Sequence, residues 1–170
     1  MELRLKRCVI RDYRPSDAES LAKSANNRKI WLGLRDAFPH PYTLDDAKNF
    51  LAGSIPGLPK LHFCIDIGGE AVGGIGLRPG EDVHRHTAEF GYWIAEEFWG
   101  QGIMSEIVPA FVDYAFQKFS LTRIFAMPHS SNAASARVLE KSGFQFEGRL
   151  RKHVIKDGQI LDSLLYARTR

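Results

Sequence analysis

Residues 87–103, TAEFGYWIAEEFWGQGI, join a stretch typical of a β-strand to a glycine-rich turn and the start of a helix. The aromatic residues favour a strand over 87–95, because such side chains are enriched in strands. Gly100-Gln101-Gly102 is followed by apolar residues at helical spacing. The start of a helix carries main-chain N–H groups without internal partners and the positive end of the helix dipole. Because glycines let a phosphate approach those groups, a diphosphate is the ligand predicted for this turn.

The turn alone is an ambiguous signal. A Gly-x-Gly segment before a helix is also a common tight turn. The segment lacks the third glycine of the dinucleotide-binding fingerprint and the Gly-Lys-Ser/Thr of a P-loop, which disfavours both of those nucleotide-binding classes.

Periodicity and turn residues predict the remaining elements. Further strands are predicted over 3–10, 61–67, 71–77, 123–127, 144–155 and 159–168. A helix capped by Ser16 or Asp17 is predicted to run through Leu21 to Ala25. Further helices are predicted over 28–34, 44–52 (with Thr43 and Asp46 as a capping box), 103 onward and 132–142. Gly53–Lys60 is predicted to be a loop, Asp157-Gly158 a hairpin turn, and Pro109 a residue that shortens or kinks its helix. This order predicts an α/β (α+β) fold, a mixed sheet with helices on its faces.

The length of 170 residues suits one domain over 1–170. The net charge of +3 is only mildly basic, and no run of Lys and Arg is dense enough to indicate nucleic-acid binding. Since no stretch approaches roughly 18 apolar residues, no membrane span is expected. Residues 1–14 lack the hydrophobic core of a signal peptide, so the expected location is cytoplasmic.

Cysteines and histidines give no sign of a disulfide or a metal site. Cys8 and Cys64 both lie in apolar strands and are expected to be buried thiols. His84-Arg85-His86 lacks a companion cluster with ligand spacing, so we predict no metal.

A second motif makes the prediction more specific. Residues 132–144 read NAASARVLEKSGF, downstream of EFGYWI at 89–94 and FWGQGI at 98–103. In these motifs and their order the chain resembles the GCN5-related N-acetyltransferase (GNAT) superfamily, in particular the branch that includes ribosomal-protein N-terminal acetyltransferases. The resemblance is strong over 61–168 and weaker in the N-terminal third.

The resemblance implies a mostly antiparallel central sheet of about seven strands with helices on both faces. In that fold the strands at 87–95 and 123–127 splay apart, and acetyl-coenzyme A, the co-substrate, binds in the gap. The pantetheine arm would pair with the first strand and the diphosphate with amides after it. The implied cofactor-binding residues are Trp93, Ile94, Ala95, Trp99, Gly100, Gln101, Gly102, Ile103, Met104, Asn132 and Ser135. For Asn132 and Ser135 a helix cap and a small packing residue are the alternatives.

The chemistry needs a base and an acid. An amine attacks a thioester only when neutral, so a carboxylate that takes its proton, directly or through water, assists the reaction. The resemblance points to Glu89 as this base, although a salt-bridged strand residue is the alternative. Many members of the superfamily use a Tyr as the acid where this chain has Leu139, which leaves Ser135 or a water as the predicted donor and a weaker case for His129.

The acceptor is not specified by these motifs. The resemblance implies substrate contacts from Trp31, Phe38, Tyr42 and Glu89, with core packing as the alternative for the aromatics. Asp162 and Tyr166 match family positions, and their alternative is bonding within a hairpin. The predicted acceptor is the N-terminal amine of a protein or peptide; a small-molecule amine and a non-catalytic acyl-coenzyme A-binding module are the alternatives. The resemblance also suggests a homodimer, with no nucleic-acid or membrane partner.

Overall fold

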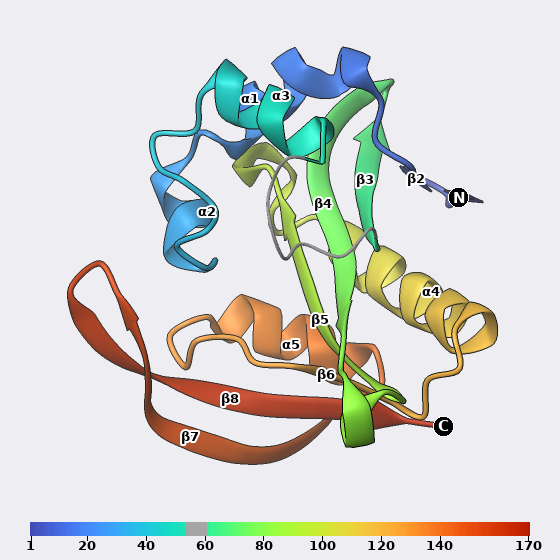
Figure 1. Ribbon diagram of the computed structural model, residues 1–170, viewed down its shortest axis with the longest axis vertical. Coiled ribbons are helices and arrows are strands. Elements are labelled where there is room, and N and C mark those ends of the chain that lie inside the picture. The colour runs from blue at the N-terminus through green and yellow to red at the C-terminus, as the bar shows by residue number, and fades with distance from the viewer. Residues whose placement is uncertain (54–60) are drawn as a thin grey trace. The chain divides into compact units, whose positions relative to one another are not determined.

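The computed structural model describes residues 1–53 and 61–170, which form eight strands and five α-helices (Figure 1). The strands are β1 (Glu2–Arg4), β2 (Val9–Arg11), β3 (His62–Ile67), β4 (Glu70–Pro79), β5 (Thr87–Ile94), β6 (Arg123–Ala126), β7 (Gln145–Lys156) and β8 (Gln159–Thr169). The helices are α1 (Ala18–Ala25), α2 (Arg28–Leu32), α3 (Leu44–Leu51), α4 (Ile103–Lys118) and α5 (Ala133–Lys141). Of the loop predicted over 53–60, all but Gly53 lies outside the described residues.

The predicted elements are confirmed with one exception, the single strand over 3–10. This segment forms two short antiparallel strands, β1 and β2, with Leu3 opposite Ile10. The Leu5 N–H donates to the Cys8 carbonyl at 2.9 Å, which closes a turn around two exposed basic residues, Lys6 and Arg7. The extra strand explains why the sheet has eight strands and not about seven.

The strand order of the sheet is β1-β2-β3-β4-β5-β6-β8-β7. The β5–β6 pair is parallel, whereas β1–β2, β2–β3, β3–β4, β6–β8 and β7–β8 are antiparallel. The sheet is therefore mixed and mostly antiparallel, as predicted.

The described residues divide into two compact units. The first contains Met1–Leu77 and Gly91–Gln101, and the second contains Arg78–Phe90 and Gly102–Arg170. Strand β5 contributes to both, because the division falls after Phe90.

In the first unit, α1 and α3 lie side by side and pack on β3 and β4 (Figure 1). The buried cluster there contains Ala18, Leu21, Ala25, Tyr42, Ala47, Cys64 and Ala71. The capping box predicted for α3 is confirmed, because the Asp46 N–H donates to Thr43 Oγ1 at 3.1 Å and the Thr43 N–H donates to the Asp46 carboxylate at 2.8 Å. Both cysteines are buried thiols, and burial raises the pKa of Cys64 to about 12.

In the second unit, α4 continues through Pro109 for 16 residues, so the predicted shortening is wrong. A proline inside a helix costs about 3 kcal/mol. The free energy gained by burying the apolar side chains of α4 outweighs this cost, since each fully buried large apolar side chain contributes roughly 1.5–3 kcal/mol. Its buried residues are Ile103, Met104, Ile107, Val108, Phe111, Val112, Ala115 and Phe116.

The β7–β8 hairpin is the longest antiparallel pair of the second unit, and α5 packs against both strands (Figure 1). Its turn is the predicted Asp157-Gly158, with φ of 51° and 74°. Positive φ at both central residues gives the backbone twist that a two-residue hairpin requires.

Candidate functional site

The turn before α4 has the backbone conformation that its glycines permit. Gly100 and Gly102 both have φ of 72°, in the left-handed region that disfavours other residues. Gly102 is the residue that precedes α4, and no side chain caps the helix start. The N–H groups at this start have no partner within the helix. They are the donors that the sequence predicts for a diphosphate.

The turn also uses some of its own polar groups. The Trp99 N–H donates to the Glu96 carbonyl at 3.0 Å, and the Trp99 indole donates to the Ile94 carbonyl at 2.8 Å. The Gln101 side chain donates to the Glu97 carbonyl at 2.7 Å. The main-chain amide of Trp99 is therefore engaged, which narrows the predicted set of phosphate-binding amides to those from Gly100 to Met104.

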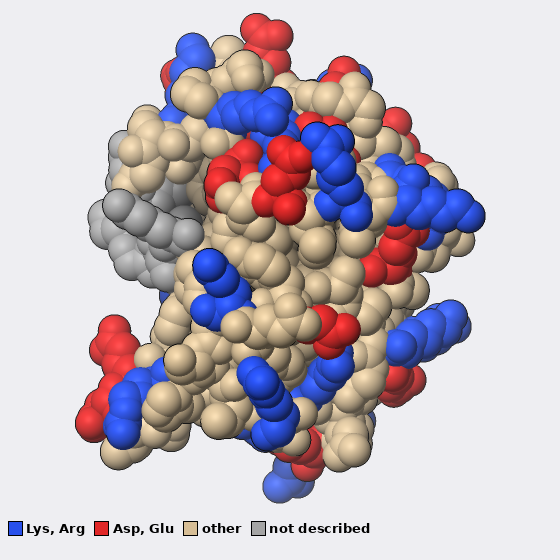
Figure 2. Space-filling view, turned by 90° about the vertical axis from the view of Figure 1, so that its right-hand side faces the viewer, with Lys and Arg blue, Asp and Glu red and all other residues tan. Residues whose placement is uncertain are grey.

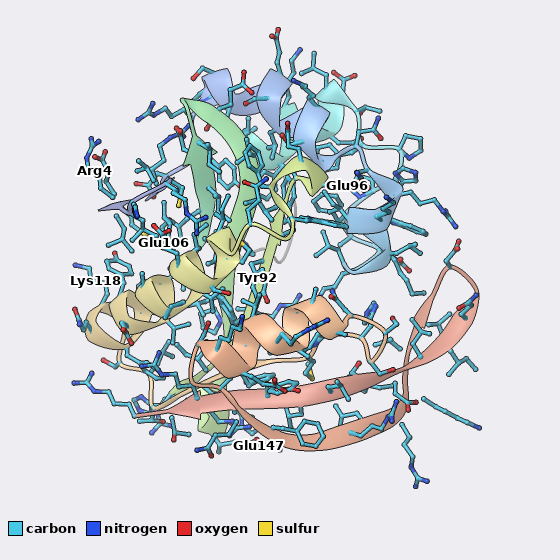
Figure 3. The ribbon with its side chains drawn as sticks, turned by 180° about the vertical axis from the view of Figure 1, so that it is seen from behind. Arg4, Tyr92, Glu96, Glu106, Lys118 and Glu147 are labelled. Atoms are coloured by element: carbon cyan, nitrogen blue, oxygen red, sulfur yellow. The ribbon has the colours of Figure 1, made fainter. Side chains whose placement is uncertain are left out.

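Side chains from distant parts of the first unit hold this turn at its beginning. The Asn27 side chain donates to the Glu96 carboxylate at 2.8 Å, and Lys29 forms an ion pair with the same carboxylate. The hydrogen bond from Lys29, followed by that from Asn27, lowers the pKa of Glu96. Figure 3 shows Glu96 on the loop that follows β5. The start of α2 is thus tied to the turn that leads into α4.

A second side chain holds the turn near its end. Arg7, on the β1–β2 turn, donates from Nη1 to the Gln101 carbonyl at 2.6 Å. The sequence does not indicate these roles of Arg7, Asn27 and Lys29, because these residues lie 67 to 94 positions away from their partners. A charged residue in a turn has no local pattern that would indicate such a contact.

At the end of β5, fewer main-chain N–H and C=O groups are available to bind a pantetheine arm than the sequence analysis expects for Trp93 to Ala95. The Ala95 N–H donates to the Val72 carbonyl of β4 at 2.8 Å. The Ile94 carbonyl accepts the Trp99 indole. Since successive peptide groups of a strand point to opposite edges, the Ile94 N–H is directed away from β4.

Glu89 lies near the beginning of β5, in the second unit. It is half-buried and stands opposite Phe125 in the parallel register with β6. This register covers three residue pairs and ends at Glu89, whereas β5 continues to Ile94. Glu89 is therefore the last paired position of β5 with β6, in the pair of strands that the family resemblance expects to splay apart.

Asn132 caps α5, which is the structural alternative raised for it. Its side-chain oxygen accepts the Ser135 N–H at 3.0 Å. This bond places the half-buried Ser135 in the first turn of the helix, and it leaves the Asn132 amide nitrogen outside the cap. Leu139, in the same helix, is fully buried and belongs to the core.

The loop before α5 is fixed to β8. The His129 carbonyl accepts the Asn132 N–H at 2.8 Å, and His129 forms a β-bridge with Ser163. His129 is half-buried. Asp162 accepts bonds from Arg149 and from the Lys152 N–H, which is the hairpin role raised for it.

The aromatic residues predicted to contact substrate differ in exposure. Phe38 lies between Tyr42 and Trp93, with ring centroids 4.8 Å and 5.5 Å away. Tyr42 is buried in the core, and burial raises its pKa to about 12, so it is a neutral phenol at physiological pH. Trp31 is half-buried and lies beside His40. Phe38 and Tyr42 thus have a packing role, and they connect the segment before α3 to β5.

The predicted site residues fall into two groups along the chain. Trp31, Phe38, Tyr42 and Trp93–Gln101 belong to the first unit, whereas Glu89, Gly102–Met104, Asn132 and Ser135 belong to the second. Residues 1–53 and 61–170 hold no cluster of His, Cys, Asp and Glu able to bind a metal ion. None of the helices in these ranges is long and apolar enough to cross a membrane.

The charged side chains are mixed on the face drawn in Figure 2. Basic and acidic residues alternate there over an otherwise uncharged surface. Among the described residues on this face, the basic side chains form no single patch of the kind that binds a nucleic-acid backbone.

The family of the chain is decided by a match between residues 7–145 and the family described as an acetyltransferase (GNAT) domain. The chain belongs to the GNAT acetyltransferase family. The match runs through both units and includes the turn, Glu89 and α5. The mixed fold and the motifs at 89–103 and 132–144 are therefore those of a GNAT domain, as the sequence predicted.

Curated relatives agree with this family. The chain is 40% identical over 98 residues to YoaA of Bacillus subtilis (strain 168), an uncharacterized N-acetyltransferase, with 58% of this chain and 55% of YoaA covered. It is 35% identical over 99 residues to the putative ribosomal N-acetyltransferase YdaF of the same organism, with 58% and 54% covered. The chain thus spans about half the length of these relatives. The L-amino acid N-acetyltransferase AaaT of Escherichia coli (strain K12) is 24% identical over 163 residues, with 95% and 98% covered.

Solved structures share the fold over almost the full length. An acetyltransferase of the GNAT family from Bacillus anthracis superposes with a TM-score of 0.84 at 25% identity, covering 99% of this chain and 98% of that one. RimL, a ribosomal L7/L12 α-N-protein acetyltransferase in complex with coenzyme A, superposes with a TM-score of 0.85 at 22% identity, covering 99% and 98%. Because the identity to RimL is only 22%, this similarity shows a shared fold and nothing about the substrate.

Proposed function

We propose that this GNAT protein transfers the acetyl group of acetyl-coenzyme A to a primary amine, by direct transfer within a ternary complex. The observation that carries the proposal is the turn at Gly100–Gly102. Two left-handed glycines precede an uncapped helix start, inside the segment that matches an acetyltransferase family. A helix start of this kind suits the diphosphate of the donor.

The residues of the turn fit such a donor by their chemistry. The amides from Gly100 to Met104 would bind the diphosphate, and the Ile94 N–H would bind the pantetheine arm. Glu97, where the superfamily often has Gln or Arg, is exposed and contacts Gln101 through its carbonyl. Because the proposed phosphate donors are main-chain groups, an acidic side chain at that position is compatible with binding.

In the proposed reaction the ammonium nitrogen loses two protons, and the leaving thiolate takes up one. Glu89, directly or through a water, takes the proton of the ammonium, and the neutral amine attacks the thioester carbonyl. The C–N bond forms, the C–S bond breaks, and the thiolate leaves. The thiolate takes a proton from the Ser135 hydroxyl or from water, since Leu139 has no proton to give. The second proton of the attacking nitrogen, which is released as the amide forms, replaces the proton that Ser135 or the water has given. Positioning of the two substrates supplies much of the remaining acceleration.

We propose the N-terminal amine of a protein or peptide as the acceptor. This choice is supported by the relative named as a putative ribosomal N-acetyltransferase and by the fold shared with RimL. Trp31 and Phe38 would contact the acceptor. Tyr42, which is buried, would support Phe38.

A free amino acid is the second candidate acceptor. It is favoured by AaaT, whose similarity extends over 95% of this chain, whereas that to YdaF covers 58%. A peptide and a free amino acid both present an α-amine, so the same base and donor site would serve either reaction.

A mass-spectrometric assay tests the proposed function. The purified protein is incubated with acetyl-coenzyme A and a panel of peptides with different first residues, amino acids and polyamines. The expected result is a gain of one acetyl group on α-amines. Glu89→Gln is expected to lower the transfer rate by about 100-fold or more, the usual contribution of a general base, while coenzyme A affinity is kept.

Glu70→Gln is the matched control, because Glu70 is an exposed glutamate at the start of β4. It should transfer acetyl groups at the unaltered rate. Equal rates for Glu89→Gln and Glu70→Gln would remove Glu89 from the mechanism. A protein that binds coenzyme A and acetylates nothing in the panel would instead be an acyl-coenzyme A-binding module.

A further inference from the structure

Arg7 makes a contact with the Gly100–Gly102 turn that the proposed mechanism does not use. It lies on the tight turn between β1 and β2, which the bond from the Leu5 N–H to the Cys8 carbonyl closes. Its Nη1 donates to the Gln101 carbonyl at 2.6 Å. The bond joins residues 94 positions apart, so the edge hairpin of the sheet reaches the turn before α4.

The geometry of the peptide bond gives this contact a directional consequence. In a trans peptide the carbonyl and the following N–H point in opposite directions. A Gln101 carbonyl held toward Arg7 therefore directs the Gly102 N–H away from Arg7. The orientation needs a constraint, because glycine allows the peptide plane on either side of Gln101 to rotate at low cost.

The bond from Arg7 is also of the stronger kind. A guanidinium is always charged in proteins, and a hydrogen bond from a charged donor is roughly twice as strong as a neutral one. It polarises the Gln101–Gly102 peptide and makes the Gly102 N–H a better donor, as expected for linked hydrogen bonds.

We infer that Arg7 is a positioning residue for the donor's diphosphate, which it orients through the Gln101–Gly102 peptide. The inference rests on the proposed function, because it presumes that the Gly102 N–H meets the diphosphate. Arg7 acts on the turn before the donor arrives, so that the amide is already aimed when acetyl-coenzyme A binds. The β1–β2 hairpin thereby has a role in donor affinity in addition to its place in the sheet.

Kinetics with two donors test the inference. Arg7→Ala is expected to raise the KM for acetyl-coenzyme A by roughly tenfold, the value of one charge-assisted hydrogen bond, with kcat within about twofold. With S-acetylpantetheine, a donor that lacks the diphosphate, Arg7→Ala should have the same kcat/KM as the unaltered protein. Arg7→Lys, which keeps a charged donor, should recover part of the affinity.

Arg4→Ala is the matched control, since it removes an equal charge from β1, where Arg4 is exposed and paired with Glu2. It should leave both donors unaffected. The Gly102 amide signal in ¹H–¹⁵N NMR of the free protein gives a second readout. In Arg7→Ala this signal should shift and broaden, whereas it should stay unchanged in Arg4→Ala.

Three results would overturn the inference. The first is unchanged KM in Arg7→Ala, and the second is an equal loss with both donors, which indicates general damage to the fold. The third is an unchanged Gly102 signal despite a raised KM, because Arg7 would then act on the phosphates themselves. If the unaltered protein fails to bind coenzyme A in calorimetry, that result counts against the proposed function itself. It can be told apart from the three results above, which concern Arg7 alone.

Discussion

At the scale of single residues, Gly102 links backbone conformation to the proposed binding of the donor. Its φ of 72° costs other residues roughly 1–2 kcal/mol. A side chain here would also project from the start of α4, beside the N–H groups proposed for the diphosphate. A substitution thus has two separable effects, strain in the backbone and obstruction of the ligand.

Gly102→Glu is predicted to lower coenzyme A affinity by about tenfold or more, because it adds bulk and a negative charge at the proposed anion site. Isothermal calorimetry measures the affinity. Gly68→Glu is the matched control: Gly68 has φ of 66°, and an added β-carbon there meets nothing within 4 Å. It should lose similar stability and bind coenzyme A normally. Equal affinities of the two variants would place the diphosphate elsewhere.

Single residues were predictable from the sequence where their partners are local. Asn132 bonds to Ser135 three positions on, and Thr43 bonds to Asp46 across the same interval, so a pattern of spacing indicates both. The contact of Arg7 with Gln101 depends on how the sheet is assembled. No spacing within the sequence encodes it.

At the scale of elements, a buried ion cluster joins β2 to the segment before α1 and to β3. Arg11 donates two bonds to the Asp17 carboxylate, each 2.8 Å, and one to Asp66 at 2.7 Å. All three side chains are buried. Burial opposes ionisation of Asp17, but the bonds from Arg11 and from the Arg14 N–H outweigh it, and the net effect is a lowered pKa of Asp17.

Asp17→Asn is predicted to lower the free energy of unfolding at pH 7 by about 3 kcal/mol or more, because it leaves the Arg11 charge buried with one partner fewer. Urea unfolding measures the loss. A carboxyl whose pKa is lowered by folding stabilises the fold above its unfolded pKa, about 4, and this stabilisation is lost as pH falls through the folded pKa. The gap between the unaltered protein and Asp17→Asn should therefore narrow below about pH 4.

Glu19→Gln gives the comparison for that experiment. Glu19 is an exposed acid in the first turn of α1, and its substitution should cost less than about 1 kcal/mol. If Asp17→Asn were as mild as Glu19→Gln, or if its deficit were constant with pH, the ion cluster would not be a determinant of stability.

Elements were predictable where a local signal marks both ends. The Asp157-Gly158 turn and the cap of α3 are such signals, and both are observed. The hairpin β1–β2 was missed, although Lys6 and Arg7 interrupt the alternation, because neither is one of the Gly, Pro, Asn, Asp or Ser residues that usually mark a turn. Pro109 led to the opposite error, a helix expected to be shorter than it is. The energetic cost of the proline can be read from the local sequence, whereas the stabilisation that α4 gains from burial depends on the tertiary structure.

At the scale of the whole molecule, the mixed sheet and the family membership followed from two motifs in a fixed order. The order of strands was not accessible from periodicity, because β8 lies between β6 and β7 in the sheet although it follows them in the chain. The proposed cofactor-binding residues could be named beforehand, because they lie within or beside the two motifs. The acceptor is left to experiment, because the motifs concern the donor.

A crystal structure of the complex with coenzyme A would show which main-chain groups bind the diphosphate. We expect diphosphate oxygens within hydrogen-bonding distance of the amides of Gly102, Ile103 and Met104, with the thiol near Glu89. A diphosphate bound at another surface, with this turn blocked by its own side chains, would contradict it.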